Sequence, residues 1–412
     1  MKDLRWLLAL GLTAGFVAPA AAQKATVINY YTSGGESRAI SVFAKEYNKR
    51  GGQWVNEPAV GPPAEQSLAL SRIAGGDPPT AMQWSVGAAM KELADKGVLA
   101  DLDSFAKAGD WAKNVPPIIM KNITFNGHVY GAPFDIGGVN YMYYSTKVFD
   151  ALKMKPPKTW DEFLADAPKI KAAGYIPLAF GGNAQQEDWL FMSLLAGVGG
   201  PQVYSQVTND HDAKVAGSAA VQRVFQVYGA LRQYVDAGSP NRKWNDSLSL
   251  VETNKAAFMI VGDWASGDFA ANHLTFGKDF GCSLAPGSQD AYIMVTDAMA
   301  FPASNKPEQV AARAKLVGVV MDPAVQAEFN VYKGSLPAML NTDVSKLDPC
   351  AQLGYKVMLK GPTHQLPHFF LAFSPNTLGE INDVLAEYWV NSKMTAADAT
   401  KKFAAIVARA GK

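Results

Sequence analysis

Aromatic and polar side chains stand close together at four places in this chain of 412 residues. The four places are Tyr30 and Tyr31 before Glu36, Gln83 beside Trp84, Asp188 beside Trp189, and Asp263 beside Trp264. An aromatic ring offers a face to the C–H groups of a hydroxylated solute, while carboxylates, amides and lysine hold its hydroxyls. Any single ring of this set could instead be a core residue. Together the four places favour a site for a hydroxyl-rich solute.

The motifs of the common enzyme classes do not occur in the sequence. It has no G-x-S-x-G elbow, no Walker A loop, no G-x-G-x-x-G after a strand and no H-E-x-x-H. His364 and His368 have the spacing of a helical metal pair, but Pro367 stands between them and further ligands are missing, so we expect no metal site. A glycosidase-like carboxylate pair leaves no such signature and stays open.

The first aromatic pair ends a segment that the sequence predicts to be a strand. Residues 25–31 are rich in β-branched and aromatic side chains, and an amphipathic stretch over 39–47 follows. Between them, Ser33 and Glu36 have the spacing of a helix capping box. The pattern predicts a strand, a turn and a helix, with the aromatic pair at the end of the strand.

Strands and helices then alternate along the chain, which is typical of an α/β fold with mostly parallel sheets flanked by helices. Asn126 and Gly127 predict a hairpin. The turn-rich segment 133–138 and the segment 285–297 are expected to cross between two lobes. We therefore expect a type II-like periplasmic-binding-protein architecture with a hinge. Its N-terminal lobe would comprise 23–133 plus 297–349, and its C-terminal lobe 134–296 plus 350–412.

The N-terminus has the features of a secretory signal peptide. Lys2 and Arg5 precede an apolar run over 6–17, and Ala20 and Ala22 form a small-residue cleavage site. The apolar run is shorter than the roughly 20 residues of a membrane span. A signal peptide over 1–22 is therefore favoured over a membrane anchor.

The expected mature chain is electrically neutral. Removing the signal peptide takes two of the 38 basic residues and one of the 37 acidic residues, which leaves a formal charge near zero. This balance gives no electrostatic reason to bind nucleic acid or an anionic membrane. About 390 residues remain, enough for at least two lobes with cores of their own.

Cys282 and Cys350 are the only two cysteines. Two buried thiols would pack like small hydrophobic side chains. An even number of cysteines in an exported chain favours a disulfide instead.

Several stretches, in order along the chain, resemble the extracellular solute-binding proteins of ABC importers, in particular their glucose-binding branch. These stretches are Tyr30–Glu36, Gly76–Pro79 with Gln83, Thr159–Phe163, Ala172–Leu178, Ile260–Trp264, Ala285–Gly287 and Lys333–Pro337. The resemblance implies two α/β lobes with a ligand in the cleft, and a disulfide between cysteines placed like Cys282 and Cys350. The ligand-binding residues expected from the patterns and the resemblance together are Tyr30, Tyr31, Glu36, Gln83, Trp84, Ser85, Asp188, Trp264, Asp297, Lys333 and His368.

The chain departs from that branch at several of these positions. Tyr30 and Tyr31 stand where the branch has two tryptophans, and Ser85 stands where it has a lysine. Phe369 replaces a histidine, with His368 one residue earlier. A lost hydrogen-bonding group changes which ligand a polar site accepts. The departures favour another monosaccharide, a deoxy sugar or a larger glycoside over glucose.

The resemblance implies a periplasmic, monomeric binding protein without a cofactor and without enzymatic activity. Such a protein captures a sugar between its lobes and delivers it to permease subunits in the inner membrane. Two other functions stay open: a secreted carbohydrate-active enzyme of the glycosidase type, and a binding protein that serves a chemoreceptor.

Overall fold

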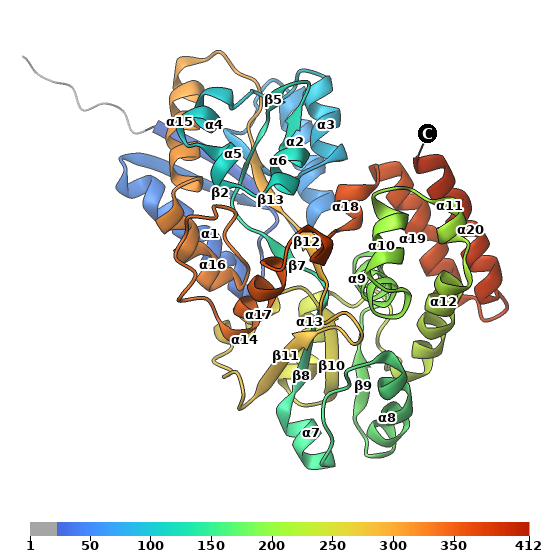
Figure 1. The fold of residues 1–412 in the computed structure, drawn as a ribbon. Coiled ribbons are helices and arrows are strands. Elements are labelled where there is room, and N and C mark those ends of the chain that lie inside the picture. The colour runs from blue at the N-terminus through green and yellow to red at the C-terminus, as the bar shows by residue number, and fades with distance from the viewer. Residues whose placement is uncertain (1–22, 412) are drawn as a thin grey trace, which may run out of the picture.

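The strands of residues 23–411, which the computed structural model describes, form two larger sheets with helices packed around each (Figure 1). We call each larger sheet with its helices a lobe. The expected two-lobed α/β class is confirmed. The proposed signal peptide, residues 1–22, lies outside the described residues, and the residue boundaries of the lobes stay a prediction.

The first lobe is built on a five-stranded sheet in the order β2-β1-β3-β13-β6. Its strands are β1 (Gln23–Asn29), β2 (Gly52–Pro58), β3 (Ala81–Ser85), β6 (Gly131–Pro133) and β13 (Asp297–Ala300). β1 runs parallel to β2 and β3, whereas β13 runs antiparallel to β3 and β6. The helices around this sheet are α1 (Gly34–Lys49), α2 (Pro62–Ala74), α3 (Ala88–Asp95), α15 (Pro307–Val320) and α16 (Pro323–Lys333).

The second lobe is built on a four-stranded sheet in the order β11-β8-β10-β9. Its strands are β8 (Tyr141–Ser145), β9 (Ile176–Ala179), β10 (Ala256–Val261) and β11 (Phe280–Leu284). Every residue of β10 is buried, because helices cover both of its faces. Helices of this lobe include α7 (Thr146–Leu152), α8 (Trp160–Ala172), α9 (Ala184–Leu194), α13 (Trp244–Glu252), α14 (Ala265–Ala271) and α17 (Pro349–Met358).

Both sheets are mixed, which corrects the expectation of mostly parallel sheets. β13 enters the first sheet from a crossing segment and runs opposite to β3. β8 likewise arrives from the other lobe and runs antiparallel to β10, whereas β9 and β10 are parallel. A strand that enters a sheet from the neighbouring lobe is not bound to the direction that a βαβ crossover imposes.

A small sheet, β14-β12-β7, lies between the two larger ones (Figure 1). Its strands are β7 (Gly137–Gly138), β12 (Tyr292–Val295) and β14 (Gln365–Pro367). β7 and β12 fall inside the two segments expected to cross between the lobes, and they pair antiparallel. Next to β7, an isolated antiparallel bridge pairs Ile136 with Leu336.

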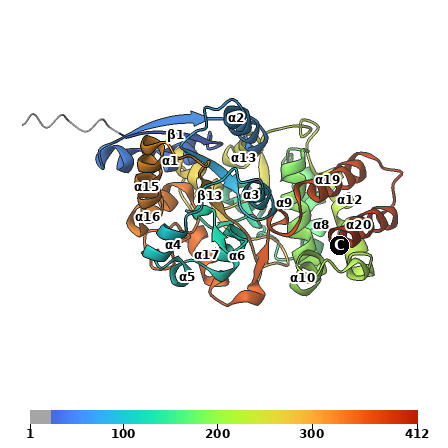
Figure 2. The same ribbon diagram turned by 90° about the horizontal axis from the view of Figure 1, so that it is seen from above.

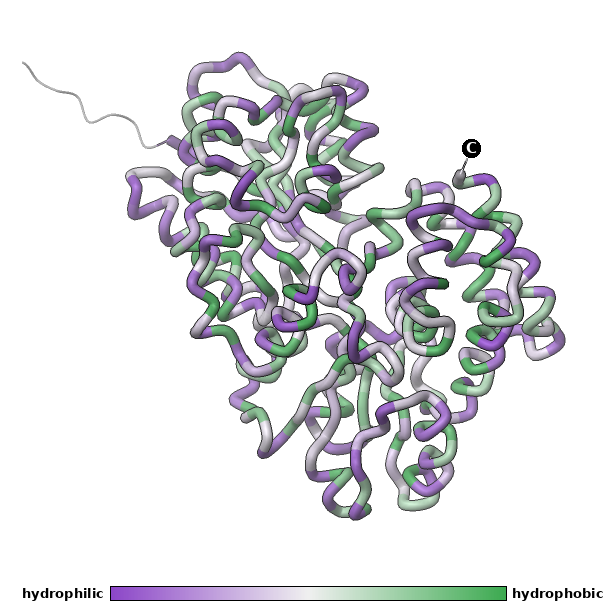
Figure 3. The backbone as a smooth tube through the Cα atoms, viewed as in Figure 1, coloured by the Kyte–Doolittle hydropathy of each residue, from purple (hydrophilic) through white to green (hydrophobic). Residues whose placement is uncertain are grey.

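The C-terminal helices extend the second lobe. α19 (Pro375–Val390) and α20 (Ala396–Ala410) pack against each other, and α20 also packs against α12 (Ala219–Leu231). Figure 2 shows these helices at the end of the molecule away from α1 and α15. Hydrophobic stretches run through the strands, and hydrophilic stretches follow the outer helices and turns (Figure 3).

Several local expectations are confirmed. Ser33 and Glu36 form a capping box at the start of α1. Asn126 and Gly127 connect the two-residue strands β4 (Thr124–Phe125) and β5 (His128–Val129), and both turn residues have positive φ. Cys282 of β11 and Cys350 of α17 form a disulfide. Among residues 23–411, no helix has the length and apolar character needed to cross a membrane.

Candidate functional site

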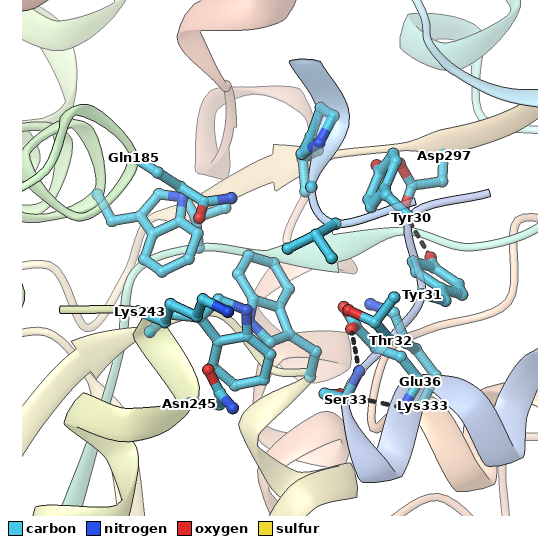
Figure 4. A pocket seen from close by; sticks show the side chains of 18 of the residues that line it. Tyr30, Tyr31, Thr32, Ser33, Glu36, Gln185, Lys243, Asn245, Asp297 and Lys333 are labelled. Atoms are coloured by element: carbon cyan, nitrogen blue, oxygen red, sulfur yellow. Dashed lines mark hydrogen bonds between the residues drawn. The ribbon is translucent and has the colours of Figure 1, made fainter. Parts of the chain in front are cut away.

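A cavity of about 500 Å³ lies where the two lobes face each other (Figure 4). The first lobe contributes the turn after β1, the first residue of β13 and the last residue of α16. The second lobe contributes the turn after β10, the start of α9 and the segment before α13. Loops and helix starts at the ends of strands from both sheets therefore form the wall, which is the usual position of ligand sites in α/β sheets.

Asp297 and two tyrosines form the polar floor of the cavity. The Tyr30 hydroxyl donates to Asp297 Oδ1, and the Tyr31 hydroxyl donates to Asp297 Oδ2 at 2.6 Å. Tyr31 also reaches Asp135 Oδ2 at 3.1 Å, and the Asp297 backbone N–H donates to Asp135 Oδ1 at 2.9 Å. This network fixes both tyrosine rings and the Asp297 carboxylate before any ligand arrives.

Lys333 is the buried cation of the site and is only 3% exposed. Its Nζ lies 3.8 Å from Asp135 Oδ2. The same Nζ lies 5.1 Å from the centre of the Tyr31 ring and 5.0 Å from the centre of the Trp264 ring. Two rings and one carboxylate thus hold the ammonium at the cavity wall, where it can donate to a ligand.

Carboxylates outnumber the ammonium in this part of the site. Burial raises the pKa of Asp135 to about 8, with Asp297 as the next cause, and burial raises the pKa of Asp263 to about 7. Burial lowers the pKa of Lys333, but the surrounding carboxylates, Asp135 first, outweigh it, so the pKa lies above its ordinary value. Lys333 therefore stays charged and gives the site a strong hydrogen-bond donor among acceptors.

Glu36 caps the start of α1 and also lines the cavity. Its Oε2 accepts from the Ser33 backbone N–H at 3.3 Å, and the Ser33 hydroxyl accepts from the Glu36 N–H at 3.3 Å. Burial raises the pKa of Glu36 to about 7, although nearby Lys333 lowers it. The capping contact uses Oε2, and Glu36 also lines the cavity. The capping role and a ligand role are geometrically compatible.

Three tryptophans give the second lobe's side of the cavity its aromatic surface. The ring centre of Trp264 lies 5.1 Å from that of Trp189 and 6.5 Å from that of Trp244. Both pairs meet edge to face, with interplanar angles of 61° and 77°. Rings held by one another present a rigid aromatic surface to the cavity.

The structure brings seven of the eleven expected residues to the cavity. These are Tyr30, Tyr31, Glu36, Trp264, Asp297, Lys333 and His368. His368 is 1% exposed, and its Nδ1 accepts from the Phe370 N–H at 3.0 Å. Burial lowers the pKa of His368 to about 3, so its ring is neutral.

The other four expected residues do not line the cavity. Gln83 is fully buried, and its Oε1 accepts from the Tyr30 N–H at 3.2 Å, so it supports the floor from behind. Trp84 packs in the core at 4% exposure, and Ser85 pairs with Asp297 along the sheet. Asp188 lies on the side of α9 that faces α19. There the Asn382 side-chain amide, with its nitrogen turned toward Asp188, donates to both carboxylate oxygens of Asp188 at 2.6 and 3.2 Å.

Sequence reasoning missed a second group of lining residues. They are Asn183 and Gln185 at the start of α9, and Lys243, Trp244 and Asn245 at the start of α13. Neither segment has a motif, and the segments are far apart in the chain. A tryptophan flanked by the polar residues Lys243 and Asn245 is the one signal that the sequence offered.

Comparison with known proteins identifies the class. Residues 31–327 match the family of bacterial extracellular solute-binding proteins. The chain belongs to this family, which confirms the resemblance found in the sequence.

Individual relatives span most of the chain. A probable sugar-binding periplasmic protein of Mesorhizobium japonicum is 33% identical over 350 residues, 84% of this chain and 83% of the relative. An uncharacterised ABC transporter extracellular-binding protein of Pyrococcus horikoshii is 27% identical over 382 residues, 89% of this chain and 83% of the relative.

Solved structures share the fold at low identity. A solute-binding protein from Thermotoga lettingae, solved with alpha-D-tagatose, has a TM-score of 0.76 and 18% identity, and the match covers 95% of this chain and 100% of that one. A chitin oligosaccharide binding protein has a TM-score of 0.78 and 18% identity, and the match covers 94% of this chain and 98% of that one. These likenesses show the two-lobed fold.

Proposed function

We propose that this protein captures a sugar in the cavity between its lobes and delivers it to the permease of an ABC importer in the inner membrane. Export through the N-terminal signal peptide would place it in the periplasm, the compartment named for several of its relatives. The observation that carries the proposal is the cavity itself. It combines carboxylates, one buried ammonium and three tryptophans at the junction of two lobes.

Capture would require both lobes. Asp297, Glu36 and Lys333 come from the first lobe, and Trp189 and Trp264 come from the second. A ligand that contacts both groups stabilises the closed arrangement, which is the general basis of hinge closure around a ligand. A micromolar dissociation constant corresponds to about −8 kcal/mol. A few charge-assisted hydrogen bonds and one or two stacked rings are enough for that affinity.

Binding without catalysis fits the state of the carboxylates. Both oxygens of Asp297 already accept tyrosine hydroxyls. A glycosidase acid and nucleophile must instead be free to exchange a proton and to attack the sugar. We therefore propose a carrier rather than a hydrolase.

A sugar screen tests the proposal. The mature chain, residues 23–412, is expected to show a raised Tm with one or a few sugars of a broad mono- and disaccharide panel, because a ligand that binds only the native state stabilises it. Calorimetry on the hits should give a stoichiometry of one. Chromatography after overnight incubation should recover the sugar unaltered. Absence of binding across the panel would overturn the proposal, and cleavage of the bound sugar would favour the enzyme.

A further inference from the structure

The cavity has two chemically different ends (Figure 4). The inner end holds the buried floor of Tyr31, Asp297 and Lys333, which are 2%, 8% and 3% exposed. Figure 4 shows Gln185, Lys243 and Asn245 on the side of the cavity opposite Asp297, Tyr30 and Tyr31. We call this second group the outer group; all three of its members are exposed.

The outer group stands on a rigid support. The carbonyl of Arg242, next to Lys243, accepts from the Asn183 and Gln186 side-chain amides, both at 2.8 Å. The Arg242 guanidinium in turn donates to both oxygens of Asp236, with Nη1 at 2.8 Å from Oδ1. A side-chain network thus ties the segment before α13 to the start of α9, so the two segments hold a fixed relative position.

The outer group has hydrogen-bonding capacity to spare. Within residues 23–411, the side chains of Gln185, Lys243 and Asn245 have no hydrogen-bond partner, although all three line the cavity. Trp244 lies among them, and its ring meets the edge of Trp264 at 6.5 Å. Trp264 itself touches the inner end through Lys333. Aromatic surface therefore continues from the inner end to the outer group.

The cavity is also larger than one sugar ring requires. Liquid water takes roughly 30 Å³ per non-hydrogen atom and bonded atoms pack more tightly, so the about twelve such atoms of a hexose fill well under 360 Å³. The cavity measures about 500 Å³. The cavity is therefore larger than one hexose ring, and the amides and the ammonium of the outer group line it.

Building on the proposed function, we infer that the outer group and Trp244 form a second sugar subsite, and that the ligand is a disaccharide or a glycoside with two rings. The inner ring would bind the carboxylates and Lys333. The outer ring would stack on Trp244 and exchange hydrogen bonds with the amides of Gln185 and Asn245 and the ammonium of Lys243.

Calorimetry with matched sugars tests the inference. The probes are D-glucose, D-galactose, D-xylose and D-mannose, and disaccharides built from them in α and β linkage. We expect one disaccharide to bind at least about 30-fold more tightly than either component sugar. Trp244→Ala should weaken that disaccharide at least about tenfold. The triple variant Gln185→Ala, Lys243→Ala, Asn245→Ala keeps the Trp244 ring against Trp264, and it should weaken the disaccharide at least about tenfold and leave any monosaccharide within about twofold.

Lys401→Ala, an exposed lysine on α20, is the matched control and should change neither affinity. Two results would overturn the subsite while the proposed function stands. One is a monosaccharide that binds as tightly as every disaccharide. That result would mean that the outer group lines the entrance of a site for a single sugar ring. The other is an equal loss of affinity for monosaccharide and disaccharide in the triple variant. Binding of no probe at all would overturn the proposed function together with the subsite.

Discussion

Asp297 accepts hydrogen bonds from Tyr30 and Tyr31 and still borders the cavity. Its carboxylate therefore orients two rings in addition to any contact with a ligand. Truncation would leave the Tyr30 hydroxyl without its acceptor and the Tyr31 hydroxyl with Asp135 alone, and a polar group that loses its partner away from water is costly.

At this residue, Asp297→Ala is expected to weaken sugar binding by more than tenfold, which corresponds to about 1.4 kcal/mol. Titration calorimetry measures the affinity. Asp383→Ala, an exposed carboxylate on α19, is the matched control. An unchanged affinity in Asp297→Ala would remove this residue from the site.

Glu65 in the first turn of α2 is 1% exposed, and its Oε1 has no hydrogen-bond partner among the described residues. Burial, and then the nearby Asp297, raise the pKa of Glu65 to about 9. The folded chain therefore holds a proton on Glu65 that the unfolded chain releases near pH 4.5. Glu65 contributes stability below that pH, and the contribution is lost as the pH rises toward 9.

The neutral isostere Glu65→Gln removes this titration. We expect Tm to fall less between pH 5 and pH 8 in Glu65→Gln than in the unaltered protein. The gap between the two proteins, the Tm of Glu65→Gln minus that of the unaltered protein, should therefore widen by a few degrees from pH 5 to pH 8. Differential scanning calorimetry at both pH values measures the gap. A gap of the same size at pH 5 and pH 8 would show that Glu65 does not titrate in this range.

Residue types near strand ends were enough to find Tyr31 of the inner end, whereas Asp297 and Lys333 were expected from the family resemblance. The expectation for Gln83 and Trp84 failed because β3 is buried on both faces. Side chains that alternate along such a strand enter the core on either side, so neither residue reaches the cavity. The outer group left no pattern to find. Its position depends on how the Arg242 carbonyl anchors one loop to another, and that contact joins segments about 60 residues apart.

At the scale of elements, α1 of the first lobe packs closely on α14 of the second. The Gly35 N–H donates to Asp268 Oδ1 at 2.7 Å, and Arg38 Nη2 donates to the Gly267 carbonyl at 2.9 Å. A Cβ on Gly35 would lie 2.6 Å from the backbone carbon of Gly267. The absence of a side chain at this position lets the two lobes meet beside the cavity.

Gly35→Ala is therefore expected to oppose closure and to weaken sugar binding at least about tenfold. The helix itself should tolerate alanine, which has a higher helix propensity than glycine. Gly318→Ala on α15 is the matched control, because a Cβ there meets nothing within 4 Å. Calorimetry measures the sugar affinity of both variants. Equal affinities would show that the contact between α1 and α14 does not limit binding.

The sequence predicted elements better than their pairing. Capping-box spacing placed the start of α1, and the Asn-Gly pair placed the hairpin, because both signals are local. The antiparallel entry of β13 and β8 was not foreseen. Strand direction there depends on the chain passing between the lobes, which no local pattern encodes.

At the scale of the whole molecule, the disulfide ties β11 to α17 across 68 residues of sequence. Cross-linking a loop of this length restricts the unfolded chain and contributes about 2–4 kcal/mol in the chain-entropy description. The variant Cys282→Ser with Cys350→Ser should lose stability by this amount in guanidinium unfolding, with sugar affinity unchanged. A variant as stable as the oxidised parent would contradict this contribution.

Two lobes were predictable because chain length and alternating elements require more than one core. The cavity between them depends on how the lobes meet, which only the structure supplies. Sugar capture and the second sugar subsite both depend on those lobes closing around a sugar.

Small-angle X-ray scattering of the mature chain, with and without the best sugar from the calorimetric screen, tests that closure most directly. The radius of gyration is expected to decrease as sugar is added, to saturate at one sugar per chain, and to follow the Kd measured by calorimetry. Scattering curves that are identical at zero and saturating sugar would contradict closure.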